Sequence, residues 1–188
     1  MKQRHRAKDL NISGKIGRDP GFRQTALPFC AAFGTLRLMK TRSPRLAVRA
    51  ILVQDGRLLL VNAYPGGRSD LWCAPGGGVM PGTSLPENLI REVSEETGLS
   101  ITVGPLALVN EFHDPKTGFH QVDLFFRCAL IGGSLDPTHR DPGRVVTTRR
   151  FFAPADLGAI RLKPDSLPRI AFGPPVHAFY DPLEVIVL

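Results

Sequence analysis

The sequence predicts a mixed fold of the α/β or α+β class, because several runs rich in Val, Leu and Ile are interspersed with only a few helical segments. Its 188 residues, 43% hydrophobic and 22% charged, suit one globular domain of ordinary size with or without a tail. This composition excludes a chain that is disordered throughout, and no internal repeat indicates a solenoid.

Two strands open the predicted domain. Residues 46–53 and 58–61 are rich in Val, Leu and Ile and flank Asp55-Gly56, a dipeptide that favours a tight hairpin turn. A loop is expected over 62–70, followed by the short apolar piece Leu71-Trp72-Cys73. The glycines and prolines of residues 75–82 then make the backbone permissive up to the first helix.

The first helix has clear start and stop signals. Ser84 and Glu87 have the spacing of a capping box, and Pro86 is tolerated in a first turn. Gly98 is a typical residue after the end of a helix. The sequence therefore predicts a helix over residues 85–97.

The second half of the chain is predicted to be mostly strand. Residues 101–112 and 119–130 form a second hairpin around the turn sequence 114–118, and a last strand is expected over 145–152. Short helices are predicted from residue 153 and near 165–171. The apolar residues 183–188 suit an edge strand, a packing arm or a contact with a partner, and the last option would favour a homodimer.

Net charge divides the chain into two parts. The total is +7, but the first 45 residues carry +9 and the remaining residues −2, so the main body does not resemble a nucleic-acid-binding protein. Met39 would make a natural start before the first strand. We therefore expect a basic extension over 1–38, which is either a disordered tail or an arm that binds RNA or phosphate, and one domain over 39–188.

The cellular setting is predicted from what the sequence lacks. Three widely spaced cysteines suit a reducing cytoplasm better than a disulfide scaffold. No apolar run approaches the roughly 18 residues of a membrane span, and the apolar piece near residue 28 is short for a signal peptide. We expect a soluble cytoplasmic protein that does not interact with membranes.

Three carboxylates stand out on the first predicted helix. Glu92, Glu95 and Glu96 occupy positions i, i+3 and i+4 and so share one face. The three negative charges repel one another, so the arrangement is favourable only beside a cation or a set of basic partners. Carboxylates are ligands that suit Mg²⁺ or Mn²⁺. A solvated helix face is the simpler interpretation of such a segment taken alone.

The surrounding residues favour the metal. Gly77-x5-Thr83-x7-Arg91-Glu92-Val93-x-Glu95-Glu96-x-Gly98-Leu99 resembles the Nudix (MutT-like) hydrolase signature, in which a Glu stands at the position of Thr83. Eight of the nine fixed positions are kept. The resemblance in element order extends from about residue 46 to residue 157.

The resemblance implies a fold, a reaction and a set of site residues. The family fold is an α/β/α sandwich with a mixed central β-sheet, and its members hydrolyse the pyrophosphate bond of a nucleoside diphosphate linked to another moiety. By resemblance, Glu92, Glu95, Glu96 and the Gly77 carbonyl would hold Mg²⁺ or Mn²⁺, Glu92 is an alternative general base, and Arg91 would orient the glutamates. Thr83 would weaken or retune metal binding.

Candidates outside the signature are less sharply defined. Asp123 and His120 are the predicted substrate-binding residues, while Glu111, Asp114 and Asp141 are other candidates for a further acid. Phe112 and Phe119 beside the 114–118 turn, and Tyr64 and Trp72 before the glycine-rich loop, either stack on a substrate or belong to the core. A Nudix-fold module that binds a nucleotide or an ADP-ribose-like ligand without cleaving it is the alternative to an enzyme.

Overall fold

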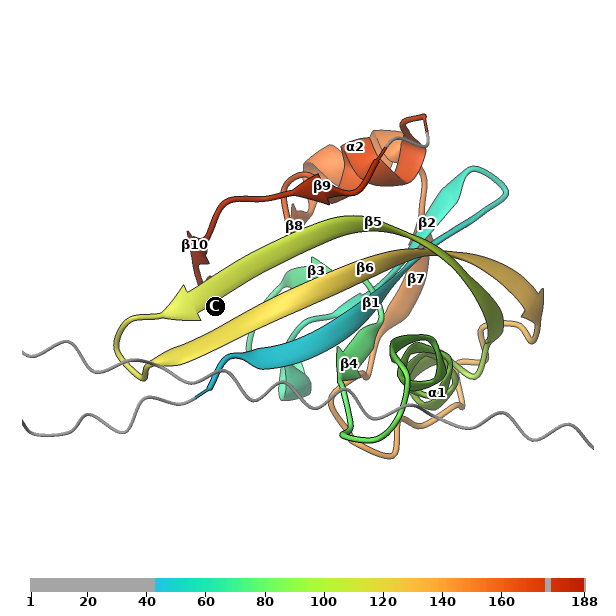
Figure 1. Cartoon of the computed structure of the whole chain (residues 1–188). Helices are drawn as coiled ribbons and strands as arrows, with labels where there is room; N and C mark the ends of the chain where they lie inside the picture. Colours follow the sequence, from blue (N-terminus) through green and yellow to red (C-terminus); the bar gives the residue numbers. More distant parts are fainter. Residues whose placement is uncertain (1–42, 175–176, 188) are drawn as a thin grey trace, which may run out of the picture. The chain divides into compact units, whose positions relative to one another are not determined.

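The computed structural model describes residues 43–174 and 177–187. Its helices and strands, shown in Figure 1, are β1 (Arg45–Gln54), β2 (Arg57–Asn62), η1 (Pro65–Gly67), β3 (Leu71–Cys73), β4 (Gly76–Gly78), α1 (Leu85–Thr97), β5 (Ser100–Asp114), β6 (Phe119–Gly132), β7 (Arg149–Phe152), η2 (Pro154–Ala159), β8 (Arg161–Leu162), α2 (Leu167–Phe172), β9 (Phe179–Tyr180) and β10 (Glu184–Val185).

The centre of the fold is a mixed sheet built around β1. Strand β1 runs parallel to β6 and antiparallel to β2 and β4, and the order along the sheet is β10-β5-β6-β1-β2-β3-β8. Helix α1 covers one face of this sheet and α2 the other (Figure 1). The predicted α/β/α sandwich with a mixed central sheet is therefore confirmed.

Alternation along β1 supplies both hydrophobic cores. Val48, Ala50 and Leu52 pack in the cluster that contains Leu89 and Val93 of α1. Ile51 points the other way, into the cluster formed with Leu167 and Ile170 of α2. Because successive side chains of a strand face opposite sides, one apolar strand can serve two layers.

The local signals for the first hairpin and the first helix are confirmed. Asp55 and Gly56 both have positive φ, 48° and 69°, which is the backbone of a type I′ turn between antiparallel strands. Helix α1 spans the predicted residues, with the Ser84–Glu87 capping box formed at its start and left-handed Gly98 at its end.

The predicted strand over 145–152 is wrong in its first half, since β7 begins only at Arg149. The backbone N–H groups of 145–148 are bound by side chains instead of a neighbouring strand. The Asp141 carboxylate accepts from Val145 and Val146, and the Asn62 side-chain oxygen accepts from Thr147 and Thr148. This loop leads from β6 towards β7.

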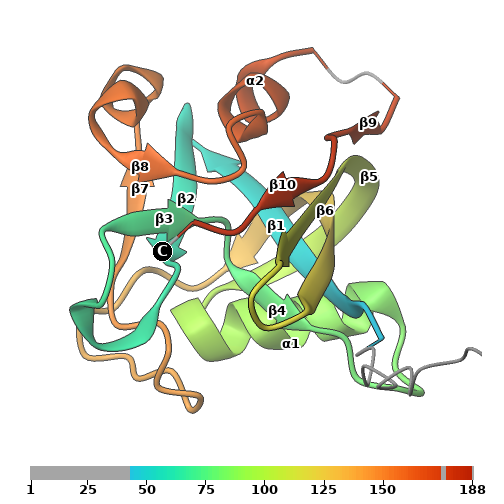
Figure 2. The ribbon, with the colours of Figure 1, turned by 90° about the vertical axis from the view of Figure 1, so that its left-hand side faces the viewer.

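The segment after α2 forms the edge strand that was one of its predicted roles. Strands β9 and β10 both pair in parallel with β5, so the segment runs along the outer edge of the sheet (Figure 2). The predicted basic extension, residues 1–38, lies outside the described residues. No helix in the described part is long and apolar enough to cross a membrane.

Candidate active site

The three signature glutamates lie on α1 in different environments. Glu96 is 9% exposed, and its carboxylate accepts a hydrogen bond of 2.8 Å from the main-chain N–H of Gly76. The Glu92 and Glu95 side chains are 17% and 39% exposed, and both pair with Arg91, at 2.7 and 2.9 Å. Arg91 thus holds two glutamates, while the glycine-rich loop holds the third.

Close packing between that loop and the helix explains two of the glycines. A Cβ on Gly77 would lie 2.5 Å from a carboxylate oxygen of Glu92, so a larger residue here would force the Glu92 carboxylate to move. Gly76 has a φ of 139°, and a Cβ there would collide with the carbonyl oxygen of Val48. The backbone at Gly77 is therefore brought directly against Glu92.

The environment of Glu96 disfavours its negative charge. The pKa of the Glu96 carboxyl is raised to about 7, chiefly by burial and also by the nearby carboxylates of Glu92 and Asp141, against the lowering effects of Arg49 and the Gly76 hydrogen bond. The negative charge of Glu96 is thus disfavoured mainly by its burial. A carboxyl group with a pKa near neutrality is typical of a functional site.

The glutamate carboxylates and the Gly77 carbonyl are oxygen ligands of the kind that a hard divalent cation prefers, although these groups are not gathered around one point. Within residues 43–174 and 177–187, no three His, Cys, Asp or Glu side chains stand together as a metal site. Arg91 engages two of the three glutamates in this arrangement. Even so, Glu92 lies against the Gly77 backbone, and the repulsion felt by Glu96 is of the kind that a cation relieves.

Asp123, a predicted substrate-binding residue, lies buried on β6 in an ion pair with Arg49 of β1. The Arg49 Nε atom lies 3.4 Å from the Asp123 carboxylate, which also accepts a hydrogen bond of 2.8 Å from Gln121. Burial disfavours the charged guanidinium, yet the carboxylates of Asp123 and Glu96 raise the pKa of Arg49 above its usual value. Arg49 also donates to the Gly76 carbonyl at 2.7 Å, so it links Asp123 to the glycine-rich loop.

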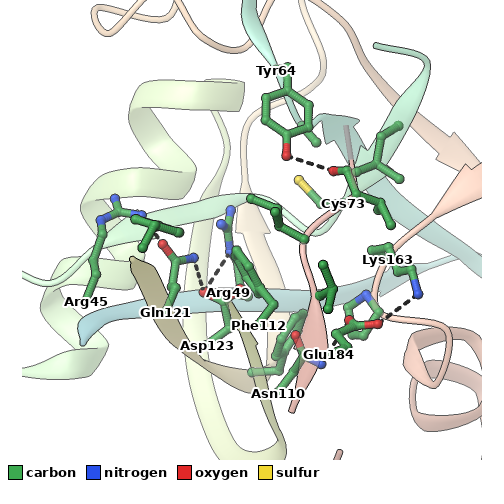
Figure 3. Close-up of a pocket in the computed structure, with 18 residues that line it drawn as sticks. Arg45, Arg49, Tyr64, Cys73, Asn110, Phe112, Gln121, Asp123, Lys163 and Glu184 are labelled. Atoms are coloured by element: carbon green, nitrogen blue, oxygen red, sulfur yellow. Dashed lines mark hydrogen bonds and ion pairs between the residues drawn. The ribbon is translucent and has the colours of Figure 1, made fainter. Parts of the chain in front are cut away.

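A pocket of about 240 Å³ opens beside this ion pair (Figure 3). Phe112 and Phe119 line it with tilted rings whose centroids are 6.1 Å apart. Charged and polar side chains also line the pocket, namely Arg45, Arg49, Asn110, Gln121, Asp123, Lys163 and Glu184. Aromatic faces beside a few convergent polar groups are typical of a ligand site.

His120, the other predicted substrate-binding residue, does not line this pocket. It lies between two lining residues of β6, Phe119 and Gln121, and therefore faces the opposite side of the strand. Its ring nitrogen lies 3.2 Å from the carboxylate of Glu111. The structure thus brings Asp123 to the pocket and separates His120 from it.

The remaining sequence candidates are placed as follows. Trp72 packs edge-on against Phe152 in the core, whereas Tyr64 lines the pocket. Burial raises the pKa of the Cys73 thiol to about 11, which suits the expectation that it is no nucleophile. Asp141 uses both carboxylate oxygens to hold the backbone N–H groups of its own loop.

Sequence reasoning did not single out Arg49, Lys163 or Glu184. Arg49 is a charged residue inside an otherwise apolar strand, and that break in pattern was the available signal. Lys163 and Glu184 reach the pocket through long-range strand pairing, which leaves no local mark in the sequence.

The chain matches the model of the NUDIX domain over residues 43–171. It is 33% identical over 92 residues to an ADP-ribose pyrophosphatase of Methanocaldococcus jannaschii, covering 49% of this chain and 54% of that protein. It is 31% identical over 97 residues to Nudix hydrolase 2 of Arabidopsis thaliana, covering 50% of this chain and 34% of that protein. The chain thus spans about half or less of the length of these relatives.

Solved structures resemble the fold over a larger share. A crystal structure of a UDP-X diphosphatase is 25% identical with a TM-score of 0.56, covering 74% of this chain and 68% of that one. A NUDIX hydrolase from Nitrosomonas europaea is 26% identical with a TM-score of 0.54, covering 62% of this chain and 77% of that one.

Proposed function

Because the chain belongs to the Nudix family, we propose that it is a hydrolase that cleaves the pyrophosphate bond of a nucleoside diphosphate linked to another moiety, with Mg²⁺ or Mn²⁺ as cofactor. The observation that carries this proposal is the contact between the signature loop and helix, where Gly77 lies against Glu92 and Gly76 binds Glu96. Relatives named as ADP-ribose pyrophosphatase and UDP-X diphosphatase support the same reaction class.

The metal ligands in this proposal are Glu92, Glu95, Glu96 and the Gly77 carbonyl, with Glu92 also able to accept a proton. When bound, a divalent cation neutralises diphosphate charge and lowers the pKa of water. Arg91 keeps Glu92 and Glu95 oriented through its two ion pairs. Because Arg49 contacts both Asp123 and the Gly76 carbonyl, the pocket and the glutamates are held in a defined relation.

The pocket is the proposed site of the nucleoside. Phe112 and Phe119 offer aromatic surface, and Asp123 keeps Arg49 in place at the pocket wall. His120 remains a substrate-binding proposal only for a group outside this pocket, because it faces the other side of β6.

A substrate screen tests the proposal. Purified protein is incubated with ADP-ribose, UDP-sugars, dinucleoside polyphosphates and nucleoside triphosphates, with Mg²⁺, Mn²⁺ or EDTA, and products are separated by chromatography. We expect metal-dependent release of a nucleoside monophosphate, abolished by EDTA and by Glu96→Gln. Binding of these compounds without any cleavage would instead support the second candidate, a nucleotide-binding module.

One observation favours that second candidate. Thr83 replaces the first glutamate of the signature, and the carboxylate of Asp141, the acid in the loop before β7, accepts hydrogen bonds from three backbone N–H groups of its own loop. A module that only binds would nevertheless have little need for the repelling carboxylates around Glu96. This favours the enzyme.

Three further proposals concern the setting of the protein. The cysteine pattern suits the reducing cytoplasm, to be tested by fractionation. The exposed apolar side chains of Leu183 and Val185 suit a homodimer, to be tested by light scattering. The basic residues 1–38 form an extension to the domain of residues 39–188, and they carry no assigned role in the reaction.

A further inference from the structure

One wall of the pocket is built by residues beyond the matched NUDIX domain. Glu184, Val185, Ile186 and Val187 line the pocket, whereas the family match ends at residue 171. This segment lies along β5, and Figure 3 shows Glu184 beside Lys163, with a dashed line joining the two side chains. The wall thus lies outside the part of the chain that the family model matches.

The backbone already fastens this segment to the domain. The N–H of Ile186 donates to the His113 carbonyl, the N–H of Asp181 donates to the Val109 carbonyl, and the Tyr64 hydroxyl donates to the Val187 carbonyl, each at 2.9 Å. Ser166 also donates to the carboxylate of Asp181. The segment therefore does not depend on Glu184 for its attachment.

Glu184 is instead held as a charged group at the pocket. Lys163 donates to one of its carboxylate oxygens at 2.8 Å, and the Asn110 amide approaches the other at 3.4 Å. Each carboxylate oxygen has two acceptor sites, so both keep one site free after these contacts. The side chain is 30% exposed, and all three residues line the pocket.

A fixed carboxylate with two free acceptor sites has a definite binding preference. It pairs with two adjacent hydrogen-bond donors, such as the N–H and NH₂ edge of a base or the vicinal hydroxyls of a ribose. Phe112 and Phe119 lie in the same pocket and supply the apolar surface for the rest of the nucleoside. The remaining lining residues include Arg45, Arg49 and Lys163, which suit an anionic ligand.

We propose that Glu184 is a specificity-determining residue, which reads paired hydrogen-bond donors on the nucleoside part of the substrate from a pocket wall that lies beyond the matched NUDIX domain. This inference rests on the proposed function for the identity of the ligand. It places the choice of substrate on the 184–187 segment, while the signature residues act on the diphosphate.

Direct binding tests this without relying on turnover. Calorimetry in EDTA compares wild type, Glu184→Gln and Asp181→Asn, using GMP against IMP for the base edge and AMP against 2′-deoxy-AMP for the ribose. Gln keeps the size of Glu184 but replaces one acceptor with a donor. Asp181→Asn is the matched control, because Asp181 anchors the same segment without lining the pocket.

The expected result is a contrast that depends on Glu184. Wild type binds the nucleotide that carries both donors roughly tenfold or more tightly than the paired nucleotide that lacks one of them. Glu184→Gln removes this preference, and Asp181→Asn keeps it. A GMP/IMP contrast identifies the base edge, and an AMP/2′-deoxy-AMP contrast identifies the ribose. Equal effects of both substitutions, or no contrast in wild type, would overturn the inference.

The substrate screen separates this inference from the proposed function. A Glu184-dependent binding contrast without cleavage of any compound would remove the hydrolase and leave the recognition site standing. Metal-dependent cleavage whose KM ratio between paired substrates is unchanged in Glu184→Gln would remove the recognition role and leave the hydrolase standing. Circular dichroism melts of all three proteins confirm that each is folded.

Discussion

The Glu96 carboxylate of α1 and the main-chain N–H of Gly76 are joined by a buried hydrogen bond of 2.8 Å. This contact docks the glycine-rich loop on the helix at the residue whose charge is least favourable, because Glu96 is buried near Glu92 and Asp141. The same loop is held from the sheet side by Arg49, which donates to the Gly76 carbonyl. Gly76 is therefore the point where sheet, loop and helix meet.

Glu96 makes stability depend on pH in the absence of metal. Its pKa is about 7 in the folded protein against an ordinary value of 4.5, chiefly through burial. Because the folded state binds the extra proton, stability is lost as the pH rises from 4.5 through 7. We expect urea titrations in EDTA to show that the unfolding free energy of Glu96→Gln, relative to that of wild type, rises by on the order of 3 kcal/mol from pH 5 to pH 8.

Saturating Mg²⁺ or Mn²⁺ provides the control for that prediction. A cation that binds the ionised carboxylate stabilises the folded wild type but not the variant, so the gap at pH 8 should narrow. Parallel stability curves for the two proteins across this pH range would show that Glu96 does not titrate as its surroundings indicate.

Gly77→Ala should damage activity far more than stability. The new Cβ would lie 2.5 Å from a Glu92 carboxylate oxygen, and that side chain can move aside only by leaving its place beside the loop. We expect a fall of roughly a hundredfold in kcat/KM with a loss of about 1 kcal/mol or less in unfolding free energy. Gly158→Ala is the matched control, since a Cβ there meets nothing within 4 Å. Similar losses in both variants would contradict the argument.

The sequence predicted those parts of the fold that local chemistry determines. The Asp55-Gly56 turn and the Ser84–Glu87 capping box lie within a few residues of the groups they organise, and both formed as expected. Residues 145–148 failed as a strand because Asp141 binds the N–H groups of Val145 and Val146, and Asn62, more than eighty residues away, binds those of Thr147 and Thr148. Long-range side-chain contacts of this kind carry no periodic signal.

The candidate site divides in the same way between parts set by local sequence and parts set by long-range contacts. The signature placed Gly77 beside the glutamates through one loop and one helix, whereas the pocket draws on β1, β5, β6 and the 184–187 segment. Asp123 and His120 are three residues apart on β6, and only the pairing of that strand decides that Asp123 faces the pocket. Sequence alone lacked this register.

Arg49→Met should destabilise the protein strongly. Asp123 is buried, and without Arg49 it would keep only its Gln121 partner, so we expect a loss of about 3 to 5 kcal/mol by urea denaturation. In a double-mutant cycle, Arg49→Met with Asp123→Leu should recover much of that loss, because neither charge remains unpaired. Strictly additive losses would show that the two side chains do not stabilise each other.

A chain that begins at Met39 should fold and react like the full sequence. It keeps every strand from β1 onward and all residues of the two hydrophobic cores described above. Thermal midpoint and kcat/KM should each agree with the full chain within experimental error. RNA affinity, measured by fluorescence anisotropy, is the complementary test, because its loss on removing residues 1–38 would identify the extension as a nucleic-acid-binding arm.

Thr83→Glu should tighten metal binding. Thr83 lies in the turn just before α1, where its carbonyl accepts a hydrogen bond from the Asn88 side chain, so its side chain can change without breaking that contact. An added carboxylate at this signature position brings a hard oxygen ligand and a negative charge towards the cation. We expect Mn²⁺ affinity, measured by calorimetry or paramagnetic resonance, to rise several-fold. Thr83→Gln supplies similar bulk without the charge, so equal affinities in the two variants would show that the missing glutamate does not limit metal binding.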